Sequence, residues 1–162
     1  IRKLQREEKV KRALIVDMDA HKGDGTAEIL SQDATIDCIS IHMKDGWPLD
    51  NPDKNNSSFI PSDLDIEVSP SDNYLNRLKE ISSFIKDDYD LCIVVHGADV
   101  FEEDILESAK GIQLTLEDCL KRDLFVNELL ERKGIPQAWV MAGGYGSEVY
   151  KVFLQFIREK FL

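Results

Sequence analysis

Apolar, β-branched segments that alternate with helical segments limit this chain to one class of fold. The expected strands cover residues 13–18, 35–43, 91–97 and 138–146. The spacing of apolar residues predicts helices over residues 3–12, 72–86, 116–133 and 147–161, with a short helix after Gly25. Thr115 and Asp118 have the spacing of a capping box. Because strands that alternate with helices form parallel sheets, we predict an α/β protein.

Size and charge exclude several classes of protein. The 162 residues, 43% of them hydrophobic and 31% charged, suit one soluble globular domain. No apolar run reaches the roughly 20 residues of a membrane span. Residues 1–12 lack the apolar centre of a secretory signal, so a cytoplasmic location is expected. The net charge of −11 disfavours direct binding of nucleic acid through its phosphates.

Two further features concern cysteines and a loop. The three cysteines, Cys38, Cys92 and Cys119, are scattered and lack C-x-x-C spacing. This pattern argues against a disulfide framework or a cysteine zinc site and favours buried, reduced thiols. Residues 44–63, rich in Pro, Asn, Asp and Ser, are expected to form a long loop.

Polar side chains gather where three of the expected strands end. The first strand runs into Asp17, Asp19 and His21, the third into Asp99, and the last into a glycine turn that carries Tyr145. Ligands of parallel α/β sheets bind at the carboxyl ends of the strands. Asp19, His21 and Asp99 would give a divalent metal three protein ligands and leave positions open, as in catalytic sites, where the metal activates water and polarises a carbonyl.

Each of these features also has an ordinary structural interpretation. Asp19 and His21 could belong to a solvated turn, Asp99 could cap a following helix, and Tyr145 could be a packed ring. His42 and His96 are interpreted as strand-end histidines with satisfied hydrogen bonds. The metal site is favoured because polar chemistry occurs at all three strand ends and six of the nine glycines lie in the same turns.

These segments resemble the motifs of the histone deacetylase family. "VDMDAHKGDGT" is similar to its D-x-D-x-H-x-G-[DN]-G motif, "HGADVFEED" to its G-A-D segment and "MAGGYG" to its G-G-Y turn. The pair Trp47-Pro48 is similar to an aromatic-proline pair of the class IV branch. The resemblance implies a three-layer fold of the arginase-deacetylase type, present in part, with residues 1–162 as the C-terminal portion of one deacetylase-like catalytic domain.

The resemblance also implies individual roles. Asp19, His21 and Asp99 match the ligands of a catalytic zinc, for which ferrous iron is the alternative. Tyr145 matches the tyrosine that polarises the acyl carbonyl, Trp47 would line the substrate tunnel, and Asp104 matches an acid that supports the metal ligands from behind. A structural potassium site is matched by Asp17, Asp19, His21, Ser40 and Ile41. The implied substrates are acetylated lysine or small acetylated amines.

Some positions depart from these families. Lys22 replaces a second histidine found in many members, which removes no metal ligand. Gly23 and Phe101 stand where the two-manganese arginases need aspartates, so one metal is favoured over two.

The largest departure is the lack of the histidine pair that family members carry upstream of the first motif. The chain has only three histidines, none in a matching context. We therefore expect a zinc-dependent deacetylase whose N-terminal half, on the same polypeptide, is the partner of this chain. The chain by itself is expected to be inactive, and its last strand to have an exposed edge. The alternative is a non-catalytic metal-binding or interaction domain that retains the fold.

Overall fold

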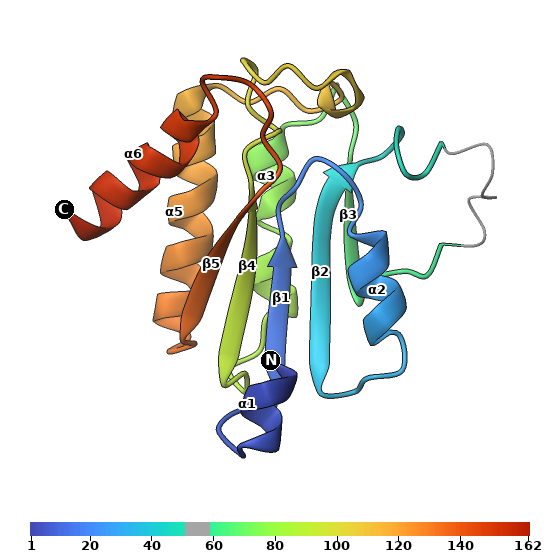
Figure 1. Ribbon diagram of the computed structural model, residues 1–162, viewed down its shortest axis with the longest axis vertical. Helices are drawn as coiled ribbons and strands as arrows, with labels where there is room; N and C mark the ends of the chain where they lie inside the picture. The colour runs from blue at the N-terminus through green and yellow to red at the C-terminus, as the bar shows by residue number, and fades with distance from the viewer. Residues whose placement is uncertain (51–58) are drawn as a thin grey trace.

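The computed structural model, which describes residues 1–50 and 59–162, contains one five-stranded parallel sheet (Figure 1). Its strands are β1 (Ala13–Asp17), β2 (Ile36–Met43), β3 (Leu64–Val68), β4 (Leu91–Gly97) and β5 (Gln137–Ala142). The strand order is β3-β2-β1-β4-β5, and every neighbouring pair is parallel. The predicted parallel α/β fold is confirmed. Part of the expected loop, residues 51–58, lies outside the described residues.

Helices cover both faces of this sheet. They are α1 (Arg2–Arg6), α2 (Asp24–Leu30), α3 (Tyr74–Leu78), α4 (Ile81–Phe84), α5 (Leu116–Arg132) and α6 (Tyr150–Phe161), with a 3₁₀ turn, η2, at Glu107–Ala109. In Figure 1, α2 lies in front of the sheet, whereas α3 and α5 lie behind it. This arrangement confirms the three-layer architecture. None of the described helices is long and apolar enough to cross a membrane.

The core is built from the central strands and the helices behind them. Leu14 and Val16 of β1, Ile39 of β2 and Val94 of β4 are fully buried, and Leu130 of α5 packs in the same cluster. Long helix α5 begins as the capping box predicts, because Thr115 Oγ1 accepts a hydrogen bond from the backbone N–H of Asp118 at 3.1 Å. The three cysteines are buried and free, as expected.

Three elements differ from the prediction. The helix expected over residues 3–12 ends at Arg6 in α1, and Glu8 just beyond it has a positive φ of 57°, which a helix cannot continue through. The expected helix over 72–86 is divided into α3 and α4, because backbone hydrogen bonds at Glu80, Ser82 and Ser83 reach back only three residues. Strand β3 was not predicted, since two of its five residues are acidic and it is a short edge strand.

Strand β5 forms the other edge of the sheet and, among the described strands, pairs with β4 alone. Val140 and Met141, two apolar residues of this strand, are 50% and 71% exposed. The expected exposed edge next to Tyr145 is confirmed. Asp19 follows β1, Asp99 follows β4 and the glycine turn follows β5, so three neighbouring strands at one side of the sheet position the candidate site.

Candidate metal centre

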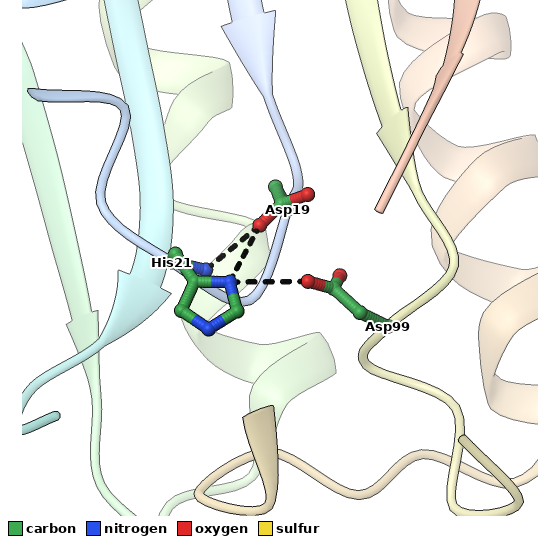
Figure 2. Close-up of side chains that lie close together, drawn as sticks. All are labelled: Asp19, His21 and Asp99. Atoms are coloured by element: carbon green, nitrogen blue, oxygen red, sulfur yellow. Dashed lines mark hydrogen bonds and ion pairs between the residues drawn. The ribbon is translucent and has the colours of Figure 1, made fainter. Parts of the chain in front are cut away.

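Asp19, His21 and Asp99 come together at the carboxyl ends of the adjacent strands β1 and β4 (Figure 2). The His21 Nδ1 atom lies 3.0 Å from Asp19 Oδ1 and 3.2 Å from Asp99 Oδ2. One potential ligand atom from each residue lies within 4.8 Å of the other two. The expected juxtaposition of the three side chains is therefore present, and their atoms match the nitrogen and oxygen ligands of a divalent metal.

Backbone amides fix one oxygen of each carboxylate. The N–H of Ala20 donates to Asp99 Oδ1 at 3.0 Å, and the N–H of His21 donates to Asp19 Oδ1 at 3.0 Å. Asp99 Oδ2 is buried and accepts no hydrogen bond from the described residues, although it forms the ion pair with His21 Nδ1 at 3.2 Å. A buried carboxylate oxygen without a hydrogen bond is costly unless a cation neutralises it. The unbonded oxygen therefore fits a metal ligand.

Two glycines allow the strand ends to approach each other closely. A Cβ atom on Gly97 would lie 2.5 Å from the Cα of Asp19. A Cβ atom on Gly143 would lie 2.3 Å from Asp19 Oδ2 and 2.6 Å from Asp99 Oδ2. Both carboxylates thus face the small space beside Gly143, which only a residue without a side chain leaves open.

The electrostatics of the cluster also favour a cation. The carboxylate of Asp19, and then that of Asp99, which lie 3.0 and 3.2 Å from Nδ1, raise the pKa of His21 from 6.5 to about 10. Burial raises the pKa of Asp99, whereas for Asp19 the hydrogen bonds with His21 outweigh burial and lower the pKa. Without a metal, the imidazolium therefore supplies the positive charge between two carboxylates. A divalent cation at Nδ1 must displace that proton.

The other face of His21 is held by residues of a different loop. Its Nε2 atom lies 3.2 Å from Ser108 Oγ, in the η2 turn, and its ring meets Trp47 edge-on with 5.8 Å between centroids. When Nδ1 binds a metal, Nε2–H can donate to Ser108 and fix the tautomer. Sequence reasoning missed Ser108 because a lone serine in a turn carries no motif.

Trp47 is 54% exposed and lines a cavity of about 360 Å³ next to the cluster. The cavity walls include Met43, Ser108 and the acidic residues Asp45 and Glu107. The structure therefore places the predicted tunnel residue in contact with His21.

Asp104 holds the turn that carries Tyr145. Asp104 is buried, and its Oδ2 accepts hydrogen bonds from the backbone N–H groups of Tyr145 at 2.6 Å and Gly146 at 3.2 Å. The Tyr145 side chain is 57% exposed. Its pKa is raised, first by partial burial and then by the charges of Asp19, Asp99 and Asp104, so the phenol lies within the field of the cluster.

Asp17 is the last residue of β1, and its side chain is buried, whereas Asp19 is partly exposed. Its Oδ1 accepts a hydrogen bond from the N–H of Asp19, and burial raises its pKa to about 7. Ser40 pairs with Asp17 across β1 and β2, and Ser40 Oγ accepts a hydrogen bond from the N–H of Gly23 at 3.2 Å. Lys22 is directed elsewhere, to Asp65 at 2.6 Å. No described basic side chain forms an ion pair with Asp17.

His42 and His96 do not face the cluster, which confirms their interpretation as satisfied strand histidines. His42 Nδ1 lies 3.0 Å from Ser40 Oγ, and His96 Nε2 lies 2.8 Å from Asp123 Oδ2. Both side chains are buried, and burial lowers the pKa of each.

The pKa of His42 predicts a loss of stability in acid. Burial lowers this pKa from 6.5 to about 4, so the neutral form stabilises the fold above pH 6.5. As pH falls from 6.5 to 4, this contribution of roughly 3 kcal/mol is lost. His42→Asn keeps a nitrogen near Ser40 but does not titrate. Urea unfolding of the wild type and of His42→Asn is measured from pH 7 to 4.5. The unfolding free energy of the wild type should fall more steeply with pH than that of His42→Asn, so the difference between them should shrink. Parallel pH profiles would contradict the prediction.

Comparison with known proteins shows which family the chain belongs to. Residues 1–159 match the model of the histone deacetylase domain. The chain is 28% identical over 156 residues to an uncharacterised protein of Picosynechococcus sp., covering 92% of this chain and 48% of that protein. It is 24% identical over 154 residues to histone deacetylase 2 of Arabidopsis thaliana, covering 93% of this chain and 38% of that protein.

Solved structures with a similar fold were also found. The structure of an acetylpolyamine aminohydrolase from Burkholderia pseudomallei superimposes with a TM-score of 0.72 at 18% identity. The superposition covers 94% of this chain and 45% of that one. The chain thus spans about half the length, or less, of the proteins it matches. Since the domain match extends over nearly every residue, the chain belongs to the histone deacetylase domain family.

Proposed function

We propose that the protein containing this chain is a zinc-dependent amidohydrolase that removes acetyl groups from lysine side chains or from small acetylated amines. The observation that supports it most is the convergence of Asp19, His21 and Asp99, with a buried carboxylate oxygen left without a hydrogen bond. The names of the relatives, a histone deacetylase and an acetylpolyamine aminohydrolase, support the same reaction class.

In this proposal Asp19, His21 and Asp99 hold the metal, with ferrous iron as the alternative to zinc. The bound metal would supply Lewis-acid activation of water and of the acyl carbonyl. The Tyr145 hydroxyl donates a hydrogen bond to the carbonyl oxygen as negative charge develops on it. Trp47 contacts the stem of the acylated amine at the cavity beside His21.

We also propose a structural potassium ion, held by Asp17, Ser40 and the chain around Asp19, His21 and Ile41. Asp17 and Ser40 are buried register partners on β1 and β2, and a Cβ atom on Gly23 would lie 2.6 Å from Asp17 Oδ2 and 3.8 Å from Ser40 Oγ. A monovalent cation there would compensate a carboxylate that has no ion-pair partner among the described residues.

The complete active site is proposed to need the N-terminal half of the same polypeptide. Deacetylation requires a general base, and neither His42 nor His96 is available, since each is buried and hydrogen-bonded away from the cluster. The exposed edge of β5, beside Tyr145, is where that half would pack. The chain by itself is proposed to bind metal weakly and to turn over little or no substrate.

The absence of a free histidine at the described site also supports a second candidate, a non-catalytic metal-binding or interaction domain. The two candidates differ in activity of the full-length protein. Zinc-loaded full-length protein should hydrolyse an acetyl-lysine peptide or an acetylated polyamine. Stoichiometric zinc binding without hydrolysis of either would favour the second candidate.

Tyr145→Phe in the full-length protein is expected to lower kcat about 100-fold, because a preorganised hydrogen-bond donor to the developing oxyanion is lost. Steady-state hydrolysis of an acetyl-lysine peptide measures the effect. Tyr150→Phe, which removes the hydroxyl of an exposed tyrosine on α6, should leave kcat unchanged. Equal activities of Tyr145→Phe and wild type would remove Tyr145 from the mechanism.

A further inference from the structure

A fully buried arginine lies behind the candidate metal centre. Arg122 and Asp123, on helix α5, are both 0% exposed. Arg122 Nε donates to Asp123 Oδ1 at 2.8 Å, and the other carboxylate oxygen lies 2.8 Å from His96 Nε2. In the sequence this pair is indistinguishable from the neighbouring charges of the helix, where Lys121 and Glu117 form an exposed ion pair.

The guanidinium links the two strand ends that lead to the metal cluster. Arg122 Nη1 donates to the carbonyl oxygen of Gly97 at 2.8 Å and to that of Met18 at 3.3 Å. Met18 precedes Asp19 directly, and Gly97 precedes Asp99 by two residues. One nitrogen atom therefore joins the backbones that set the separation of the two carboxylate ligands.

Burying the Arg122 guanidinium is expected to add little to the free energy of unfolding. A buried ion pair gains little over apolar residues of similar size, because desolvation offsets the attraction. Arg122 Nη2 bonds to no described residue, so the hydrogen bonds recover only part of that cost. What the planar guanidinium offers is a rigid set of donors, of which Nε is anchored on Asp123 and Nη1 reaches both carbonyls.

The anchor is itself held in place. His96, which contacts Asp123, is packed edge-on against the rings of Trp139, Phe153 and Phe156 at centroid distances of 5.0 to 5.6 Å. Each oxygen of the Asp123 carboxylate thus has a partner, His96 on one side and Arg122 on the other, and these contacts restrict the movement of the Arg122 side chain. A continuous series of contacts therefore connects these aromatic rings, through His96, Asp123 and Arg122, to the carbonyl oxygens of Met18 and Gly97.

We infer that Arg122 is a positioning residue that holds Asp19 and Asp99 at the separation a metal requires. The link to metal affinity rests on the proposed function, whereas the link to the strand ends rests on the hydrogen bonds themselves. Arg122→Lys keeps the positive charge but cannot both pair with Asp123 and bridge two carbonyls through a rigid fork.

The test compares Arg122→Lys with Arg132→Lys, the same change at an exposed arginine near the end of the same helix. Hydrogen–deuterium exchange of the metal-free chain should be faster in Arg122→Lys over residues 17–21 and 97–101, by about tenfold, as expected for the loss of one hydrogen bond. Cobalt(II) titration should show affinity reduced about 10- to 100-fold, with altered d–d absorption. Arg132→Lys should match the wild type in both measurements.

Unchanged exchange in the two segments would overturn the inference, and so would faster exchange with unchanged cobalt affinity and spectrum. If the wild-type chain binds no cobalt, the proposed metal centre fails, while the exchange data still decide whether Arg122 orders the strand ends. If Arg122→Lys does not fold, the double variant Arg122→Met/Asp123→Asn, which leaves no unpaired buried charge, is measured in its place with the same expected results.

Discussion

Replacing Asp99 with asparagine is expected to abolish saturable zinc binding by the chain. Asp99 supplies a buried carboxylate oxygen that no described group hydrogen-bonds, so its charge is available to the metal. If structural zinc binds with about 10–16 kcal/mol through four ligands, each ligand contributes roughly 3 kcal/mol, or at least about 100-fold in affinity. Isothermal titration calorimetry with zinc measures the change.

Asparagine preserves the shape of the side chain and the acceptor for the Ala20 N–H, so the fold should persist. Glu128→Gln, the same carboxylate-to-amide change at an exposed site on α5, should leave the affinity for zinc unchanged. An Asp99→Asn protein that binds zinc with wild-type affinity would exclude Asp99 as a ligand.

The second large effect is expected at the glycine turn. In Gly143→Ala the new Cβ would lie 2.3 Å from Asp19 Oδ2 and 2.6 Å from Asp99 Oδ2, distances that force both carboxylates out of position. Gly143 is not among the glycines with positive φ, so the effect is steric and falls on the ligands. Zinc affinity should drop by at least about 100-fold, since two ligands move together.

Gly25→Ala is the matched control for Gly143→Ala. A Cβ at Gly25 meets nothing within 4 Å, and alanine in helix α2 should stabilise the chain by roughly 0.5–1 kcal/mol. Thermal unfolding and zinc titration of both variants separate a packing effect from a ligand effect. Wild-type zinc affinity in Gly143→Ala would show that the carboxylates do not converge at this turn.

Much of the fold could be predicted because its determinants are local. Strands β1, β2 and β4 are apolar runs with β-branched residues, and the Thr115 cap fixes where α5 begins. The grouping of Asp19, His21 and Asp99 follows from topology, since adjacent parallel strands end at the same edge of the sheet. Each of these inferences needs only a short stretch of sequence and one rule of chain geometry.

The features that could not be predicted depend on contacts distant in sequence. Strand β3 forms because β2 offers it an edge, although its own residues alternate with acids. Ser108 and Arg122 matter through contacts to residues 87 and 104 positions away, which no local pattern records. The acidic Asp104 was expected to support the metal ligands, and the structure has it holding the backbone of the Tyr145 turn.

Anomalous diffraction at the zinc absorption edge, from crystals grown with one equivalent of zinc, shows directly whether Asp19, His21 and Asp99 form a single metal centre. We expect one strong anomalous peak, about 2.0–2.2 Å from His21 Nδ1 and from carboxylate oxygens of Asp19 and Asp99. Zinc bound only elsewhere, at surface carboxylates or at a cysteine, would contradict this expectation.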